Sequence, residues 1–462
     1  MHTEVKLERK LNPVNVWSLA LGSIIGWGAF VMPGTTFLPK AGPLGTLIGM
    51  AIAALVMICI ALNYGYMVQK YPVAGGEYAF AKNAFGTKHA YLCGWFLSLS
   101  YLAIVPLNAT ALGLVSRKLL GGVLEFGHLY SVAGWDIYIG EILLASAALI
   151  IFGVLSIKGI SVAGWIQTAM AFALVASVLI LAVFAIMNPD VNFSNLQPAY
   201  PSGRSSFAAI VAVVAVAPWA FVGFDSIPQA AEEFNFSPSK VNRIMIFAIL
   251  FGGAVYVILN TITASFMPWE QLLEKGYDWP TGEAVEFIMG KVGLIFLGVA
   301  LVCAVLSGII GFYMATSRLL FSMAREHALP KWFCVIDPKT KTPKNAILFV
   351  MLISLTAPWF GREVLVWIVD MSSIGAAIGY GYTCMATYKT LKANPQDKKP
   401  VLKALSVIGT IFAVIFVGLL VIPGMPSYLA LESRICLLIW CVMGIAFYFW
   451  SKKQYFGGKY NG

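Results

Sequence analysis

Two long stretches without a charged residue constrain the fold of this chain more than any other feature. Residues 11–39 and 41–69 contain no Asp, Glu, Lys or Arg. Each is longer than the roughly 20 residues that a helix needs to cross the hydrocarbon core of a bilayer. The first stretch is too long for the apolar segment of a signal peptide, and a second follows it at once. We therefore expect both to be retained as membrane-spanning helices.

The composition also indicates that much of the chain is surrounded by lipid. Apolar residues make up 59% of the 462 positions and charged residues only 11%, about half the charged fraction of a soluble globular chain. The seven cysteines form no C-x-x-C pair, the four histidines share no helical face, and no G-x-x-x-x-G-K-[ST] motif occurs. We therefore predict no metal site, no cofactor and no ATP-driven mechanism.

Apolar windows separated by short polar connections predict twelve spanning helices. They lie at roughly 13–37, 43–69, 89–117, 136–157, 161–187, 205–232, 241–268, 291–320, 344–361, 364–390, 402–424 and 428–450. This division leaves residues 1–12 and 451–462 as terminal segments and places helices 11 and 12 within residues 391–450. The stretch 74–86 is too short and too polar to span, so we expect an amphipathic or re-entrant loop there.

The basic residues predict the orientation. Of the 31 Lys and Arg residues, 23 fall on the side that carries both termini and 8 on the other side. The positive-inside rule then places both termini in the cytoplasm and the chain in the cytoplasmic membrane. The net charge of +10 follows from this topology, so we predict a lipid bilayer around the protein and no nucleic-acid partner.

The first predicted helix contains an unusual cluster of glycines. Residues 22–28 read G-S-I-I-G-W-G, and each glycine inside a helix costs about 1 kcal/mol relative to alanine. An unwound backbone at Gly26 and Gly28, with dihedral angles that a Cβ atom disfavours, would bring N–H groups against an anionic ligand in mid-membrane. The alternative is that the glycines only let neighbouring helices pack closely.

The sixth predicted helix has a second interruption near its middle. Residues 217–225 read A-P-W-A-F-V-G-F-D, with a proline that removes a backbone donor and a glycine that permits unwinding. Two interrupted helices five spans apart predict an inverted-repeat transport core over residues 13–390, with halves at 13–187 and 205–390. The binding site should lie between the two breaks.

Several motifs carry a resemblance to a known family. They are G-S-I-I-G-W-G-A-F at 22–30, Y-P-x-A-G-G at 71–76, G-W at 94–95, S-R at 317–318, A-R at 324–325 and L-P-K at 329–331. Together they resemble the amino acid–polyamine–organocation superfamily of permeases over essentially the whole chain. The resemblance implies an all-α polytopic membrane protein with a leucine-transporter-like core, acting as a secondary transporter and not as an enzyme.

The resemblance also implies a set of substrate contacts. In similar permeases, backbone amides of the first-helix motif bind the substrate carboxylate, and carbonyls from helices 1 and 6 bind the ammonium group. The matching positions are Gly26, Trp27 and Gly28 for the amides, and Ile24, Trp219 and Val222 for the carbonyls. Trp27 departs from the family, which usually has Ser or Thr there, so a hydroxyl contact is lost or replaced.

Two aromatic residues complete the set that the resemblance implies. Trp219 matches a helix-6 tryptophan that packs on the substrate in the family's arginine exchanger, and Phe312 matches an aromatic residue of helix 8. Such a ring can close over a bound solute and stack on a cation or an apolar side chain. The alternative is that each ring only fills the core.

Departures from the family bear on the substrate and on coupling. Relatives that carry cationic amino acids tend to have G-W-x-L-x-L-E-Y in helix 3, whereas this chain has Ser100 in place of the acid. This favours neutral substrates, with Ser100 and Asn108 as candidate polar contacts unless they bond neighbouring helices. Ala171 stands where proton-coupled relatives often have a lysine, as in exchangers and facilitators. A co-transported ion, sodium included, stays open.

Asp225 is the clearest ionisable residue within a predicted span. Such residues are costly and usually functional, and in relatives an acid at this place is linked to gating or to proton sensing. The alternative is that Asp225 only caps the half-helix that follows the break. Glu141 and Asp370 lie nearer the ends of their predicted spans.

These observations favour a transporter of neutral amino acids that works by alternating access. An amine permease for ethanolamine or a polyamine is the alternative, although its substrate would leave the first-helix amides unused. A membrane-embedded enzyme would need convergent acid, base or metal groups, and the sequence has no such cluster. A receptor that senses amino acids without transporting them is also compatible with the sequence.

Overall fold

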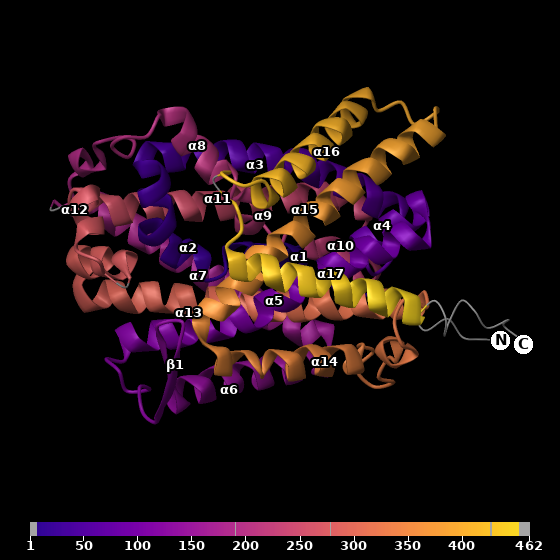
Figure 1. The fold of residues 1–462 in the computed structure, drawn as a ribbon, viewed down its shortest axis with the longest axis horizontal. Helices are drawn as coiled ribbons and strands as arrows, with labels where there is room; N and C mark the ends of the chain where they lie inside the picture. The colour runs from indigo at the N-terminus through magenta and orange to yellow at the C-terminus, as the bar shows by residue number, and fades with distance from the viewer. Residues whose placement is uncertain (1–6, 190, 278, 426, 452–462) are drawn as a thin grey trace, which may run out of the picture.

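The computed structural model describes residues 7–189, 191–277, 279–425 and 427–451, and in it the chain folds into a bundle of helices that run mostly along one common direction (Figure 1). Within these residues, eight helices are long and apolar enough to cross a membrane, and a shorter apolar helix covers Lys344–Phe360. The expectation of an all-α polytopic membrane protein is confirmed.

The first part of the chain forms helices and one short hairpin. In order, the elements are α1 (Pro13–Ile25), α2 (Gly28–Met32), the π-helix η1 (Pro33–Phe37), α3 (Leu38–Lys70), α4 (Gly76–Phe85), α5 (Thr87–Leu119), β1 (His128–Val132), β2 (Trp135–Tyr138), α6 (Ile139–Lys158), α7 (Ile160–Met187) and the 3-10 turn η2 (Phe193–Leu196).

The second part contains the interrupted sixth helix and the longest helices. The elements are α8 (Ser206–Val214), α9 (Ala217–Ala220), α10 (Ser226–Gln229), η3 (Ala231–Glu233), η4 (Pro238–Lys240), α11 (Val241–Ser265), α12 (Trp269–Glu274), α13 (Pro280–Arg325), η5 (Lys331–Cys334), α14 (Lys344–Ser354), η6 (Ala357–Phe360), α15 (Gly361–Ala393), α16 (Pro400–Val421) and α17 (Leu431–Ser451).

Two of these helices extend beyond the predicted spans and bend at a glycine. α3 begins before the predicted second span, and Gly42 within it has a φ of 66°. α13 begins at Pro280, well before the predicted start at residue 291, and Gly290 within it has a φ of 62°. Glycine adopts these left-handed angles readily. Each long helix is therefore two helical segments joined at a glycine, one of which lies outside the predicted span.

The helices on the outside of the bundle expose apolar side chains. In the most apolar 18-residue window of each helix, only part of the residues are buried. The buried share is 33% in α7, 28% in α16 and 11% in α17. Trp165 of α7 is 65% exposed and Ile186 is 71% exposed. Apolar surface on this scale is unsuited to water and suits hydrocarbon. These faces complete the burial of the chain only within a bilayer.

A β-hairpin covers the end of the bundle where α5 ends, which we call the hairpin end. β1 and β2 pair antiparallel, and the Tyr130 hydroxyl donates a 2.7 Å hydrogen bond to the Trp359 carbonyl. Arg117 lies 4.3 Å from the centre of the Trp135 ring, and its Nε donates to Glu141 Oε1 at 2.6 Å. Glu141 thus belongs to a structural ion pair at this end.

The opposite end of the bundle, which we call the α4 end, is held together by two ion pairs. Arg318 Nε lies 2.9 Å from Glu233 Oε1, and both side chains are only 1% exposed. Arg325 Nη1 lies 2.9 Å from Glu232 Oε2. Glu232 also accepts hydrogen bonds from the backbone N–H groups of Leu7 and Ala74, each at 3.2 Å. Four separate segments therefore meet there.

We predict that Glu233→Gln destabilises the protein by about 3 to 5 kcal/mol, because it leaves the buried Arg318 guanidinium without a compensating charge. As a control, Asp397→Asn removes the partner of Lys70, whose side chain is 41% exposed, and should cost at most about 1 kcal/mol. Denaturant titration in detergent micelles would measure both. Equal losses for the two variants would contradict this account of the α4 end.

Candidate functional site

The first helix is interrupted where the glycines predicted it. α1 ends at Ile25 and α2 begins at Gly28, and Gly26 between them has a φ of 43°, in the left-handed region that favours glycine. Among the described residues, the backbone N–H group of Gly26 donates to no protein acceptor. The break therefore leaves a backbone donor available in the middle of the bundle.

The other two glycines of the cluster have different roles. A Cβ atom on Gly22 would lie 2.5 Å from both Gln167 Nε2 and Ser307 Oγ, so Gly22 lets α1 pack closely on α7 and α13. Close packing was the alternative explanation, and it fits this residue. Gly28 has no left-handed φ, but its Cβ would lie 2.4 Å from Cη2 of Trp219. The expectation of a special backbone angle is therefore wrong for Gly28, which is instead kept small by an aromatic ring.

The sixth helix is divided into α8, α9 and α10, and its break touches the first one. Gly223, between α9 and α10, has a φ of 127°. A Cβ atom on it would lie 2.6 Å from Ser23 Cβ and 2.7 Å from the Ile24 backbone nitrogen. Only glycine allows α1 to approach this closely. The two interruptions are therefore in direct contact, although almost two hundred residues separate them in sequence.

A small cavity of about 20 Å³ lies between the two breaks, which is room for about one water molecule. Its lining brings most of the predicted site residues together and adds several that no sequence pattern singled out as binding residues, such as Tyr256. The lining residues are Ser23, Ile24, Ile25, Gly26, Trp27, Gly28, Ile104, Leu107, Asn108, Trp219, Val222 and Tyr256.

Unpaired polar atoms face this cavity. Asn108 is 1% exposed, and its Oδ1 has no hydrogen-bond partner among the described residues. A Cβ atom on Gly26 would lie 3.5 Å from that oxygen. The Tyr256 hydroxyl lies 3.5 Å from the Ile24 carbonyl oxygen, to which it donates. Buried polar groups are normally paired, so the unpaired Asn108 oxygen and the Gly26 N–H group suit a polar ligand.

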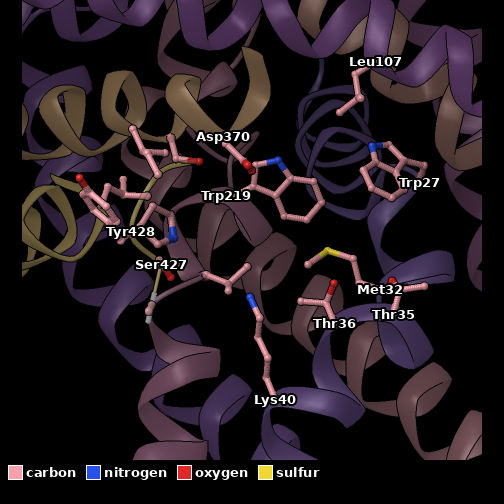
Figure 2. Close-up of a pocket in the computed structure, with 16 residues that line it drawn as sticks. Trp27, Met32, Thr35, Thr36, Lys40, Leu107, Trp219, Asp370, Ser427 and Tyr428 are labelled. Atoms are coloured by element: carbon pink, nitrogen blue, oxygen red, sulfur yellow. The ribbon is translucent and has the colours of Figure 1, made fainter. Parts of the chain in front are cut away.

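Two tryptophans separate this cavity from a larger one. The Trp27 and Trp219 ring centroids are 5.7 Å apart with an interplanar angle of 66°, an edge-to-face contact. Both rings also line a cavity of about 290 Å³ on the side of the hairpin end, which we call the vestibule. Figure 2 shows Lys40, Asp370 and Tyr428 among the residues that line it, together with the two indole rings. The ring pair is thus a partition between vestibule and cavity.

Two predicted site residues line neither cavity. Ser100 packs against α15, where a Cβ on Gly375 would lie 3.2 Å from Ser100 Cβ. The Phe312 ring is fully buried and lies 5.8 Å from the Tyr101 ring. Both positions fit the alternative interpretations, in which Ser100 contacts a neighbouring helix and Phe312 fills the core. Spacing alone could not tell which face of each helix points to the breaks.

Asp225 occupies the N-cap position of α10, but its side chain makes no capping bond. Oδ1 accepts a hydrogen bond from the Gly223 N–H at 2.7 Å, and Oδ2 accepts one from the Tyr101 hydroxyl at 2.9 Å. The capping interpretation is therefore wrong for this carboxylate. It stabilises the break itself and connects it to α5.

Comparison with known sequences gives a consistent result. The profile of the amino acid permease family matches residues 11–447. The chain is 26% identical to the branched-chain amino acid permease BcaP of Bacillus subtilis, over 98% of this chain and 95% of that protein. It is 25% identical to mouse cationic amino acid transporter 4, over 85% of this chain and 61% of that protein. It is 21% identical to the low-affinity putrescine importer PlaP of Escherichia coli K12, over 86% and 84%.

We predict that Trp219→Ala connects the small cavity to the vestibule. In a background without the native cysteines, Asn108→Cys would be modified slowly by a hydrophilic thiol reagent, because the rings cover it. Adding Trp219→Ala should raise the modification rate about tenfold or more, since a covered site is exposed only in minor conformations. The control is Trp165→Ala, at a residue that is 65% exposed on the outer face of α7. Equal rates with and without the Trp219 ring would contradict the partition.

Proposed function

Because this chain belongs to the amino acid permease family, within the amino acid–polyamine–organocation superfamily, we propose that it carries neutral amino acids across the cytoplasmic membrane by alternating access. It is a multi-pass membrane transporter and not an enzyme. The proposed topology has twelve spans, inverted repeats over 13–187 and 205–390, and both termini in the cytoplasm. In this orientation the vestibule opens to the outside.

The observation that carries the proposal is the set of polar groups that line the cavity between the two breaks. The N–H groups of Gly26 and Gly28 suit a substrate carboxylate, because the start of a helical segment favours an anion. The Ile24 carbonyl and Asn108 Oδ1 suit an ammonium group on the other side. A zwitterionic α-amino acid presents both charges on groups that are bonded to one carbon atom, and so can reach both sets of contacts at once.

Two of the carbonyls expected to bind the ammonium group differ in availability. The Trp219 carbonyl already accepts the Val222 N–H at 3.3 Å. Among the described residues, no backbone N–H donates to the Val222 carbonyl. We therefore assign the ammonium contacts to Ile24 and Val222, and assign Trp219 the role of covering the substrate with its ring.

The lining of the cavity supports a neutral, apolar substrate side chain. Ile104, Leu107 and the two indole rings are apolar, and no Asp, Glu, Lys or Arg is among the lining residues that the structure describes. A basic side chain would lose its hydration there without gaining a counter-charge, which costs several kcal/mol. The name of the Bacillus subtilis relative, a branched-chain amino acid permease, agrees with such a lining.

The two ends of the molecule support alternating access. On the vestibule side, the residues that line both the cavity and the vestibule are Trp27, Trp219 and Leu107, with the two rings in contact with each other. On the other side, the path is blocked by the packed α4 end with its buried pair between Arg318 and Glu233. A substrate would enter from the vestibule when the rings move, and would leave only after the α4 end opens.

An amine substrate is the rival within the same family, and a competition experiment separates the two. The protein is reconstituted in liposomes loaded with an unlabelled branched-chain amino acid, and entry of the labelled amino acid by exchange is measured. We expect neutral amino acids to compete and their decarboxylated amines to fail, because an amine leaves the Gly26 N–H group unpaired. Absence of entry of the labelled amino acid, or competition by putrescine or ethanolamine as strong as that by neutral amino acids, would overturn the proposal.

We predict that Gly28→Val slows exchange about 5- to 150-fold, because overpacking against the Trp219 ring costs about 1 to 3 kcal/mol. The matched control is Gly418→Val in α16, where a Cβ would meet Ile422 Cδ1 at an ordinary 3.5 Å. Both variants should insert into the membrane and purify as single species. Normal exchange by Gly28→Val would show that the contact between Gly28 and Trp219 has no part in transport.

A further inference from the structure

Two buried carboxyl groups lie between the cavity and the α4 end. Asp225 follows the cavity-lining Val222 by three residues, and Glu77 lies in α4, which does not span the membrane; both are fully buried. The Tyr101 hydroxyl lies 2.9 Å from Asp225 Oδ2 and 3.2 Å from Glu77 Oε1. One phenol therefore bridges a carboxyl group on the cavity side and a carboxyl group on the α4 side.

The groups that face these two acids are neutral. Tyr64 donates to Glu77 Oε1 at 2.9 Å and Gln229 Nε2 donates to Glu77 Oε2 at 2.6 Å. Among the described residues, the Cys93 thiol of α5 and the Tyr380 phenol of α15 also lie close enough to interact electrostatically with them. Within the part of the chain that the structure describes, no Lys, Arg or His hydrogen bonds or ion-pairs with either carboxyl group.

Two carboxylates buried together without a cation cannot both stay ionised at moderate cost. Burial, and after it the neighbouring Asp225 carboxylate, raise the pKa of the Glu77 carboxyl well above its usual range. The contrast with Glu233 is direct, since Glu233 is equally buried but is paired with Arg318. A proton therefore reduces the charge of the pair formed by Glu77 and Asp225, whereas Arg318 compensates the charge of Glu233.

The side-chain amide of Gln229 is suited to reversible protonation of Glu77. Gln229 is fully buried, and its Oε1 has no partner among the described residues, while its Nε2 points at Glu77. When Glu77 is ionised, the amide donates to it as observed. After a half-turn of the amide, Oε1 would accept the hydrogen of a protonated Glu77. The same amide therefore suits either protonation state of Glu77.

We propose that Asp225, Tyr101 and Glu77 form a proton relay that couples amino-acid transport to proton movement. The inference rests on the proposed function and adds the coupling ion to it. A proton passes from the Asp225 carboxyl group to the Tyr101 hydroxyl oxygen, while the hydroxyl's own proton passes to the Glu77 carboxylate. The phenol is unchanged, Asp225 becomes ionised and Glu77 becomes neutral.

Opening of the α4 end would complete the relay. α4 packs on α10 so closely that a Cβ on Gly76 would lie 2.7 Å from Gln229 Nε2. When α4 and α10 separate, water reaches Glu77, its carboxylate form becomes stable, and the proton leaves to the cytoplasm. The relay gives this chain a route to proton coupling even though Ala171 stands where proton-coupled relatives often carry a lysine.

The test compares gradient-driven accumulation with exchange in the same proteoliposomes. With an alkaline lumen, the wild-type protein should concentrate a labelled neutral amino acid, up to about tenfold per unit of pH difference for one proton per substrate. Glu77→Gln should lose this accumulation and retain exchange, which moves no net proton. Glu326→Gln is the control, since Glu326 also contacts α4, through Lys82, but is 38% exposed. It should accumulate like the wild type.

The outcomes separate the relay from the proposed function. If the wild-type protein exchanges no amino acid, the proposed function fails. If it exchanges but does not respond to the pH gradient, or accumulates only with a sodium gradient, the relay alone is overturned. Normal accumulation by Glu77→Gln overturns it too. If Glu77→Gln does not purify as a single species, Tyr101→Phe takes its place, because it keeps both carboxyl groups and removes the hydroxyl that bridges them. Loss of accumulation with retained exchange in this variant supports the relay. Unchanged accumulation overturns it.

Discussion

The contact between the two interrupted helices determines the arrangement of everything around it. Gly223 approaches Ser23 and the Ile24 backbone so closely that no side chain could lie between them. This contact places the unpaired Gly26 N–H group of the first break beside the second break, and it leaves the small cavity between them. In an unbroken helix the backbone N–H and C=O groups hydrogen bond to one another. Where a helix is broken inside a bilayer, no water is present to replace those hydrogen bonds. Unpaired backbone groups at this depth are therefore tolerable only where protein surrounds them and a ligand can complete them.

The sequence was sufficient for those features that the bilayer or the backbone imposes. Long apolar stretches predicted the spanning helices, and Gly26 and Pro218 marked the breaks, because few residue types can occupy such positions. Features that depend on packing could not be predicted. Nothing in the sequence marks Tyr256 as a neighbour of Ile24, or Glu77 as a neighbour of Asp225. Ser100 and Phe312 were placed in the site by family resemblance, but in the structure each points toward a neighbouring helix, and a small rotation of a helix decides that outcome.

The α4 end handles buried charge in two different ways. Glu233 is compensated by Arg318, and removing either partner would leave a charge without an opposite. Glu77 and Asp225 share a phenol and lack a cation among the described residues, so their charge can change only by gaining or losing a proton. The first arrangement stabilises one conformation. The second stabilises whichever conformation matches its protonation state, which suits the alternating access that we propose for this chain.

The ring contact between Trp27 and Trp219 has a consequence for how small a solute can be. With the rings together, the cavity between the breaks is about 20 Å³, smaller than the amino acid that it would hold. A solute must therefore replace the ring contact, which is worth about 0.5 to 1.5 kcal/mol beyond the area it buries. A branched side chain offers enough apolar surface to do so, whereas glycine offers almost none. The same two rings that separate the cavity from the vestibule would thus set a lower limit on substrate size, a form of selectivity that requires no specific contact to the side chain.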